Sequence, residues 1–263
     1  MEQKKIKGGV IIIGSLRWEN EKNAIQNKDS KELAKKREEW RNSYLNFKKE
    51  KAIPLPIGYG RSSSSRNCTY TMVFSNEYLD LRMGQGLLIP YKDDIDFSDV
   101  EIFKKHCCEL AIIEGICKKD ETTFRKKWGC IGIFINKKSD KKQVVSNFWG
   151  QFRILDNNYK KTPNDLSFEN NSLIDNDYSF IESVVIDTDL DFLLFTYIQP
   201  QHRNAEFKRI PTANEIAEEI IRSGYKIYFE ENTKHQIKTT HDEEIIKICN
   251  KDLMEKLIFV NSS

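Results

Sequence analysis

The chain has 263 residues, of which 39% are hydrophobic and 31% are charged, so it can bury a core beneath a strongly charged surface. Its 42 Lys and Arg residues are balanced by 40 Asp and Glu residues, which leaves a formal charge of +2. This balance excludes a protein that binds nucleic acid or an anionic membrane through its overall charge, but it leaves room for a local anion site.

Several classes of protein are excluded by what the chain lacks. No apolar run approaches the roughly 18 residues of a membrane-spanning helix, and we expect no membrane partner. The apolar run at residues 10–13 is too short for a secretory signal. The six cysteines form no Cys-x-x-Cys pair. We therefore expect free thiols in a reducing cytoplasm, with neither a metal nor another cofactor.

The first part of the chain predicts a mixture of strands and helices. The continuous β-branched run at residues 10–13, closed by Gly14, predicts a central buried strand. Residues 19–30 are polar almost throughout and predict a mobile loop, and a loose apolar stripe predicts a helix over 29–49. Further predicted elements are an edge strand or extended crossover at 52–57, which contains Pro54 and Pro56, a small-residue loop at 58–67, and strands at 68–75 and 87–89.

The middle of the chain contains the clearest helical pattern. Apolar residues recur at helical spacing over 98–117, and Ser98 with Glu101 predicts a capping box at its start. Residues 128–135 predict a strand, whereas the pattern over 141–152 fits a helix or an extended segment equally well. Residues 156–177 are rich in Asn and Asp and predict a long loop or linker.

The C-terminal part predicts strands at 183–186, 192–198 and 225–229, and helices at 212–223 and 242–249. Thr212, Glu215 and Gly224 supply the start and stop signals of the first of these helices. The chain thus divides into a core at 1–155, a linker at 156–180 and an extension at 181–263, which we expect to pack together as one composite domain. The predicted fold class is α+β, with a mixed sheet or small barrel and flanking helices.

Two short motifs could bind an anion. The turn Gly14-Ser15-Leu16-Arg17 follows the buried strand, and a turn of this kind can point several backbone N–H groups at a carboxylate or phosphate. An ordinary tight turn is the alternative. Arg61 and Arg66 flank four serines after Gly60, and they could hold an anion by charge-assisted hydrogen bonds. The alternative there is a flexible polar loop.

Other polar residues could take part in chemistry. Glu114, beside Gly115, has Ile112, Ile113 and Ile116 around it, and an apolar setting raises the pKa of a carboxyl toward that of a general acid or base. The alternative is a solvated Glu near the end of a helix. His202, His241 and the alternating Asp187, Asp189 and Asp191 are weaker candidates, for which a surface position is the better interpretation.

The sequence Ile12-Ile13-Gly14-Ser15-Leu16-Arg17 resembles the Y-G-[ST]-L-[RM] signature of the gamma-glutamylcyclotransferase-like family, with Ile13 in place of the tyrosine. In that family the loop amides hold the γ-glutamyl carboxylate, and a Glu in an E-G context is the general acid/base. Glu114-Gly115 resembles that position, and residues 128–135 resemble the strand that follows it. The resemblance implies 5-oxoproline and a released amine as products.

The resemblance covers about half of the chain. The charged segment 19–51 looks like an insertion, and the chain after about residue 140 has no counterpart in small members of the family. Three hypotheses follow. The chain is a cyclotransferase-like enzyme with Glu114 as its acid/base, a non-catalytic module that binds a small anion or nucleotide through Ser15, Arg61 and Arg66, or a component of a larger assembly. The sequence leaves the oligomeric state open.

Overall fold

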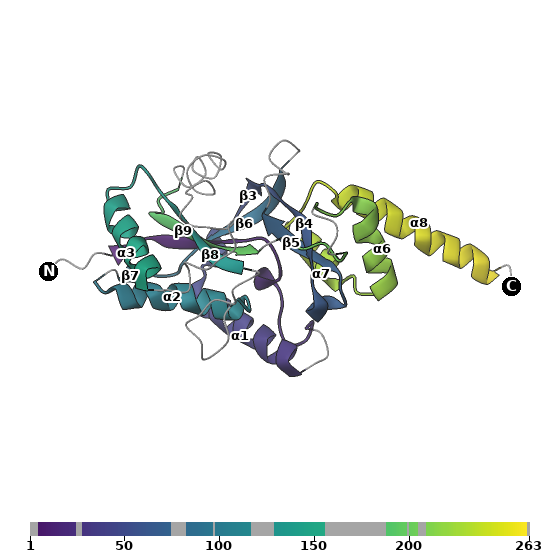
Figure 1. The fold of residues 1–263 in the computed structure, drawn as a ribbon, viewed down its shortest axis with the longest axis horizontal. Helices are drawn as coiled ribbons and strands as arrows, with labels where there is room; N and C mark the ends of the chain where they lie inside the picture. The colour runs from purple at the N-terminus through teal and green to yellow at the C-terminus, as the bar shows by residue number, and fades with distance from the viewer. Residues whose placement is uncertain are drawn as a thin grey trace.

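The computed structural model describes residues 5–24, 28–74, 83–96, 98–116, 129–155, 188–198, 200–204 and 209–261. These residues form an α+β fold around a five-stranded mixed sheet (Figure 1). The strand order is β3 (Lys51–Leu55), β6 (Gly84–Pro90), β2 (Gly8–Ile12), β9 (Phe192–Ile198) and β8 (Gly129–Ile135). Strands β2 and β9 are parallel, and the other neighbours are antiparallel.

The position of each strand in the sheet follows from its sequence. All five residues of β2 are buried, which is the pattern of a strand covered on both faces, and β2 is the central strand as predicted. Strand β3 contains Pro54, which cannot donate a ladder hydrogen bond, and β3 lies at the edge as predicted. Both predictions are confirmed.

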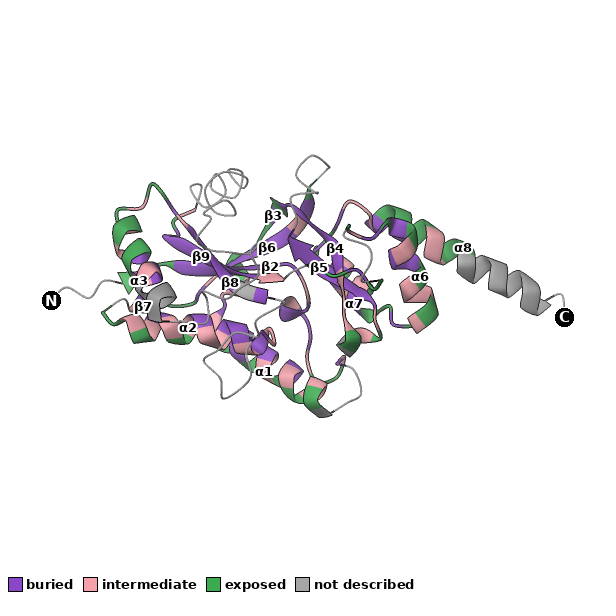
Figure 2. Ribbon diagram, viewed as in Figure 1, coloured by how far each residue is buried: buried purple, intermediate pink, exposed green. Residues whose placement is uncertain are grey.

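Helices cover the sheet and leave the strands as the buried layer (Figure 2). Helix α2 (Val100–Ile113) packs against β8, β9 and α3 (Lys142–Leu155), and α1 (Lys28–Tyr44) lies beside α2. Segment 141–152, whose pattern was undecided, is therefore helical over most of its length. The predicted helix over 29–49 ends at Tyr44 and is followed by a short 3-10 helix, η2 (Phe47–Lys49).

The predicted loop at 58–67 was wrong. Strand β4 (Ile57–Ser62) pairs with β5 (Tyr70–Phe74) in an antiparallel hairpin whose turn contains η3 (Ser64–Arg66). Tyr59 is fully buried, so this segment carries core as well as polar residues. A smaller ribbon joins β1 (Lys5–Ile6) to β7 (Ile95–Asp96).

The C-terminal part contains α6 (Ala213–Ser223), α7 (Ile227–Lys234) and α8 (Asp242–Asn261), and α8 extends away from the sheet (Figure 1). The predicted capping box between Thr212 and Glu215 is confirmed, as is Gly224 in the left-handed conformation after α6. The predicted strand at 225–229 was wrong, because this segment enters α7. The helix start predicted at Ser98 was also wrong, since Asp99 is the N-cap and accepts a hydrogen bond from the Glu101 amide.

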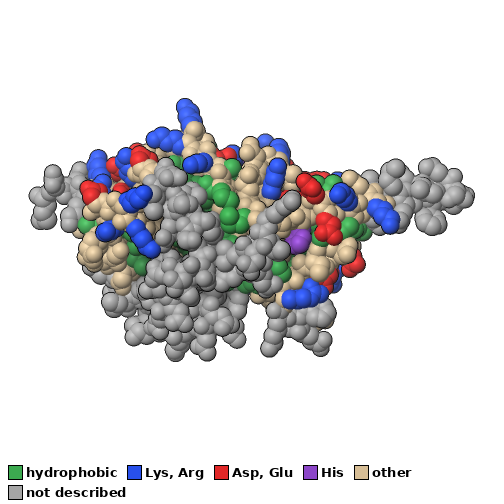
Figure 3. Space-filling model, turned by 90° about the horizontal axis from the view of Figure 1, so that it is seen from above, with side chains coloured by type: hydrophobic (Ala, Val, Ile, Leu, Met, Phe, Trp, Pro, Cys, Tyr) green, Lys and Arg blue, Asp and Glu red, His purple; other side chains and the backbone are tan. Residues whose placement is uncertain are grey.

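The predicted linker at 156–180 and the predicted strand at 183–186 lie outside the described residues. No helix in the described ranges combines the length and the apolar character needed to cross a membrane. On the face shown in Figure 3, Lys and Arg side chains are interspersed with Asp and Glu side chains, which agrees with the balanced composition.

Candidate functional site

A cavity of about 690 Å³ lies beyond the end of β2. Its walls come from the turn after β2, from α1, from the β4–β5 hairpin, from the end of α2, from β9 and from α7. The two predicted anion motifs and Glu114 comprise seven residues, and five of them line this one cavity: Gly14, Ser15, Arg61, Arg66 and Glu114. The fold therefore brings together residues up to 100 positions apart in the chain, from Gly14 to Glu114.

The turn after β2 forms the inner wall. Gly14 precedes η1 (Ser15–Arg17), and the amides of Arg17 and Trp18 donate to the carbonyls of Gly14 and Ser15 over 3.1 Å each. The first N–H groups of a helix have no acceptor within it. Among the described residues, the amides of Ser15 and Leu16 donate no hydrogen bond. Of these two residues Ser15 lines the cavity, so its amide is the donor that this wall can offer to an anion.

Arg66 joins this turn to a buried carboxylate. Its Nη2 donates to Ser15 Oγ over 2.8 Å and to the two carboxylate oxygens of Glu19 over 3.2 and 3.3 Å. Glu19 is only 6% exposed, although it lies in the segment for which the sequence predicted a polar loop. The sequence analysis missed this residue, because its partners are distant in the chain.

Glu114 ends α2 and lines the cavity. Gly115 has a φ of 74°, and the amides of Gly115 and Ile116 donate to the carbonyls of Ile112 and Ala111 over 2.9 and 2.8 Å. This is a Schellman ending, in which glycine takes the left-handed conformation that other residues avoid. It fixes the place where the helix stops, and so fixes the position of the Glu114 side chain.

Burial raises the pKa of Glu114, and the neighbouring guanidinium groups of Arg37 and Arg66 oppose part of that rise. The side chain is 14% exposed, and one of its oxygens lies 3.9 Å from Arg37 Nη2. A carboxyl with a raised pKa exchanges its proton more readily near neutral pH than an ordinary Glu does. The structure thus places Glu114 in a cavity and raises its pKa, which are the two features that the predicted acid/base role requires.

Arg37 of α1 occupies the space between Glu19 and Glu114. It makes an ion pair with Glu19, and its Nε donates to the Ile113 carbonyl over 2.7 Å. Burial lowers the pKa of Arg37 to about 10, so its guanidinium stays charged at neutral pH. The sequence analysis did not single out Arg37, but one signal was present. Arg37 falls on the same helical face as Leu33 and Trp40, which form the apolar stripe of α1.

Helix α7 packs against the turn after β2. The Tyr228 hydroxyl accepts a hydrogen bond from the Met72 amide over 3.2 Å, and the Arg66 guanidinium lies 5.1 Å from the centre of the Tyr228 ring. Trp18 Nε1 donates to Asn232 Oδ1 over 2.6 Å. The sequence analysis missed Tyr228, because it assigned this segment to a strand.

Leu16 and Arg17 were also singled out in the sequence, but neither side chain lines the cavity. Leu16 is 1% exposed and belongs to the core. Arg17 Nε donates to Glu50 over 2.6 Å, and its guanidinium lies over the Phe47 ring. The structure therefore does not bring Leu16 and Arg17 to the cavity with the other predicted residues.

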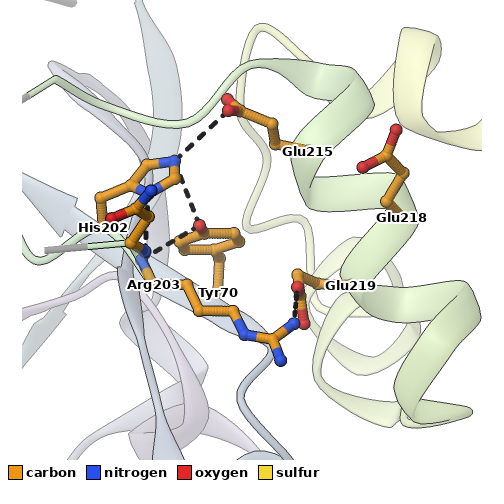
Figure 4. Close-up of a pocket in the computed structure, with 7 residues that line it drawn as sticks. Tyr70, His202, Arg203, Glu215, Glu218 and Glu219 are labelled. Atoms are coloured by element: carbon orange, nitrogen blue, oxygen red, sulfur yellow. Dashed lines mark hydrogen bonds and ion pairs between the residues drawn. The ribbon is translucent and has the colours of Figure 1, made fainter. Parts of the chain in front are cut away.

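His202 lines a second, smaller cavity of about 360 Å³ between β5 and α6 (Figure 4). Its Nδ1 accepts from the Asn204 amide over 3.1 Å, so its Nε2 carries the proton and faces Tyr70 Oη at 3.3 Å and Glu215 at 3.5 Å. Glu219 pairs with Arg203 in the same cavity. These hydrogen bonds and ion pairs join the chain after β9 to α6, with His202 buried and Arg203 exposed, which is typical of a structural contact.

Of the remaining candidates, Asp189, Asp191 and His241 line neither cavity. Asp191 accepts hydrogen bonds from the Lys7 amide over 2.8 Å and from the Ser139 hydroxyl over 2.5 Å, and Asp189 pairs with Lys7 Nζ at 2.7 Å. Asp187 lies outside the described residues. Among the residues that the structure describes, no group of His, Cys, Asp or Glu side chains is arranged to hold a metal ion.

Comparison of the chain with protein-family models, with curated proteins and with solved structures gave no match. The function therefore has to be argued from the geometry of the cavity.

Proposed function

We propose that the chain is an enzyme that cyclises a γ-glutamyl compound and releases 5-oxoproline and an amine, as the resemblance to the gamma-glutamylcyclotransferase-like family implies. One observation carries this proposal. The buried Glu114 carboxyl lines the same cavity as Ser15 and Arg66, the side chains best placed to hold a carboxylate.

The placement of the cations in the cavity supports an anionic substrate. The lining contains the cations Lys36, Arg37, Arg61 and Arg66 and the carboxyl groups of Glu19, Asp29, Glu32 and Glu114, so its charges balance. The anion site is therefore local: the Arg66 guanidinium donates to Ser15 Oγ over 2.8 Å, and a substrate carboxylate would bind beside these two side chains.

In the proposed reaction, the α-amine of the substrate attacks its own γ-carbonyl carbon. The new C–N bond closes the five-membered ring, and the bond from the same carbon to the leaving nitrogen breaks. Glu114 takes one proton from the attacking amine and gives it to the leaving nitrogen. The step consumes no water and needs no cofactor, because the proton that one nitrogen loses is the proton that the other gains.

The test is to incubate the full chain with γ-glutamyl-alanine, a γ-glutamyl alkylamide and glutathione, and to measure 5-oxoproline by mass spectrometry. The α-linked dipeptide Glu-Ala is the matched control, because it lacks the γ-amide. We expect 5-oxoproline from at least one γ-linked compound and none from Glu-Ala.

The Glu114→Gln variant should lose turnover by about 10²- to 10⁴-fold, the usual contribution of a general acid/base. Glu101→Gln is the matched control, because Glu101 is an exposed residue of the same helix. A Glu114→Gln variant with full turnover would remove the proposed role of this carboxyl.

The same arginines support a second candidate, a module that binds a small anion without chemistry. Calorimetry on the chain with L-glutamate and with a nucleotide, repeated on the Arg61→Ala/Arg66→Ala variant, tests it. Binding that the double variant loses, in a chain without turnover of any γ-glutamyl compound, would favour this candidate over the enzyme.

A further inference from the structure

A continuous network of polar and charged side chains in the cavity joins the anion-binding turn to Glu114. Ser15 accepts from Arg66, Arg66 also donates to Glu19, Glu19 pairs with Arg37, and Arg37 lies 3.9 Å from Glu114. The segments involved are the turn after β2, the β4–β5 hairpin, α1 and the end of α2. These residues lie far apart in the sequence and meet only in the folded chain.

The burial of this network of side chains indicates that it does more than stabilise the fold. The side chains of Glu19 and Arg37 are each 7% exposed, and that of Arg66 is 12% exposed. Removing such charges from water costs several kcal/mol per ion, and apolar residues of similar size would stabilise the fold equally well or better. Buried charges of this kind are typical of functional sites, where they set the ionisation of a neighbouring group.

Arg37 is the member of this network that lies next to Glu114. Three described groups face the Glu114 carboxyl: Arg37 from α1, Arg66 from the β4–β5 hairpin and Tyr228 from α7. Of the two cations, Arg37 has the larger effect on Glu114. The Ile113 carbonyl and Glu19 hold two other faces of the Arg37 guanidinium, so its position is constrained.

We propose that Arg37 is a positioning residue that sets the ionisation of Glu114, and that Glu19 modulates this effect by competing for the same guanidinium. The effect of Arg37 on catalysis rests on the proposed function, whereas its effect on the ionisation of Glu114 does not. It also gives a role to α1, which belongs to the charged segment 19–51 outside the family resemblance.

The test is to titrate Glu114 in the full chain by isotope-edited infrared spectroscopy, with the Glu114→Gln variant used to identify its carboxyl band. The Arg37→Gln variant should titrate Glu114 at higher pH than the wild type, because a nearby positive charge is lost. The Glu19→Gln variant should shift the titration to lower pH, because Arg37 loses its competing partner. Arg37→Lys, which keeps the charge, should restore a midpoint close to that of the wild type.

Arg41→Gln is the matched control. The Arg41 side chain is also 7% exposed, lies one turn further along α1 and donates to the Glu19 carbonyl over 2.6 Å, but it is not among the groups that act on Glu114. Arg41→Gln should leave the midpoint of Glu114 unchanged. If Arg37→Gln does not fold, the shift in Glu19→Gln still decides the question.

Unchanged midpoints in the Arg37→Gln and Glu19→Gln variants would overturn the inference, whether or not the chain is active. Opposite shifts in a chain that releases no 5-oxoproline would support the inference and refute the proposed function. In an active chain, Arg37→Gln should move the acidic limb of the pH–rate profile to higher pH. Turnover on that limb should fall about tenfold for each pH unit of this move.

Discussion

Replacing Gly14 by alanine measures how tightly α7 packs against the anion-binding turn. A Cβ at this position would lie 2.5 Å from the Tyr228 hydroxyl oxygen, which is closer than real Cβ contacts occur. The next nearest atom is Tyr228 Cζ at 3.5 Å, an ordinary van der Waals distance. The φ of Gly14 is −175°, outside the left-handed range that favours glycine, so the contact with Tyr228 is the feature that the substitution probes.

The one contact of Gly14→Ala that is too short is therefore with a hydroxyl group. Inserting a methyl group into a packed site costs about 1–3 kcal/mol, and we expect the free energy of unfolding to fall by that amount. Tyr228→Phe alone should also destabilise, because it leaves the buried Met72 amide without its acceptor, at a cost of about 1–3 kcal/mol.

The two changes should not add. Once the hydroxyl is absent, the nearest atoms to the alanine methyl are Cζ at 3.5 Å and Cε2 at 3.8 Å, which are ordinary van der Waals distances, so the double variant should be more stable than the sum of the single variants predicts. We expect a coupling of about 1–2 kcal/mol in this double-mutant cycle, measured by urea unfolding followed by circular dichroism.

Gly150→Ala is the matched control. Gly150 lies inside α3, and a Cβ there meets nothing within 4 Å. The same chemical change should therefore stabilise the chain by up to about 1 kcal/mol through helix propensity. Additive effects of Gly14→Ala and Tyr228→Phe, or a Gly14→Ala variant as stable as the wild type, would refute the packing that we describe between α7 and the turn.

Two further predictions concern stability. Thr212→Ala removes the capping box of α6 and should lower the free energy of unfolding by about 1 kcal/mol in urea, whereas the exposed Asn214→Ala in the same turn should change it by less than about 0.5 kcal/mol. Burial raises the pKa of Asp242 from 3.8 to about 6. The contribution of this carboxyl to the free energy of unfolding is therefore fully present below pH 3.8 and is lost as the pH rises through about 6. Asp242→Asn should consequently raise the free energy of unfolding by about 1–3 kcal/mol at pH 7.5 and have little effect at pH 4, and equal gains at both pH values would contradict the burial of this carboxyl.

The elements that the sequence predicted well are those whose signals are local. Strand β2 contains a β-branched run, β3 contains Pro54, which confines it to an edge, and α6 carries its own cap and stop residues. The conformation of Gly115 is local in the same sense, because a Schellman ending needs only a residue that tolerates positive φ. These features need no information about the rest of the chain.

Helix α7 was mispredicted because its signal depends on tertiary contacts. The apolar residues Tyr225, Ile227 and Phe229 alternate, which is the pattern of a strand. The structure instead buries Tyr228 and Asn232, one helical turn apart, against the turn after β2. A helix of eight residues has little intrinsic stability, so its partners decide its conformation.

The residues next to Glu19 in the sequence could not indicate that it is buried, and the reason is electrostatic. A carboxylate in a polar segment is normally solvated, and burying it is favourable only where cations replace the water. Its two cations, Arg37 and Arg66, lie 18 and 47 positions away. A window of sequence around Glu19 holds neither, and the site is visible only once α1 and the β4–β5 hairpin have been placed.

The topology of the sheet explains why the cavity needs both ends of the chain. Strands β2 and β9 are parallel, so their carboxyl ends lie at the same edge of the sheet, where open α/β sheets typically bind ligands. The turn with Ser15 follows β2 at that edge, and Thr196 and Ile198 near the end of β9 line the same cavity. Helix α7, further along the chain, then packs on the turn through Tyr228. The part of the chain that has no counterpart in the family resemblance is therefore a wall of the proposed site, and it can influence which substrate the site accepts.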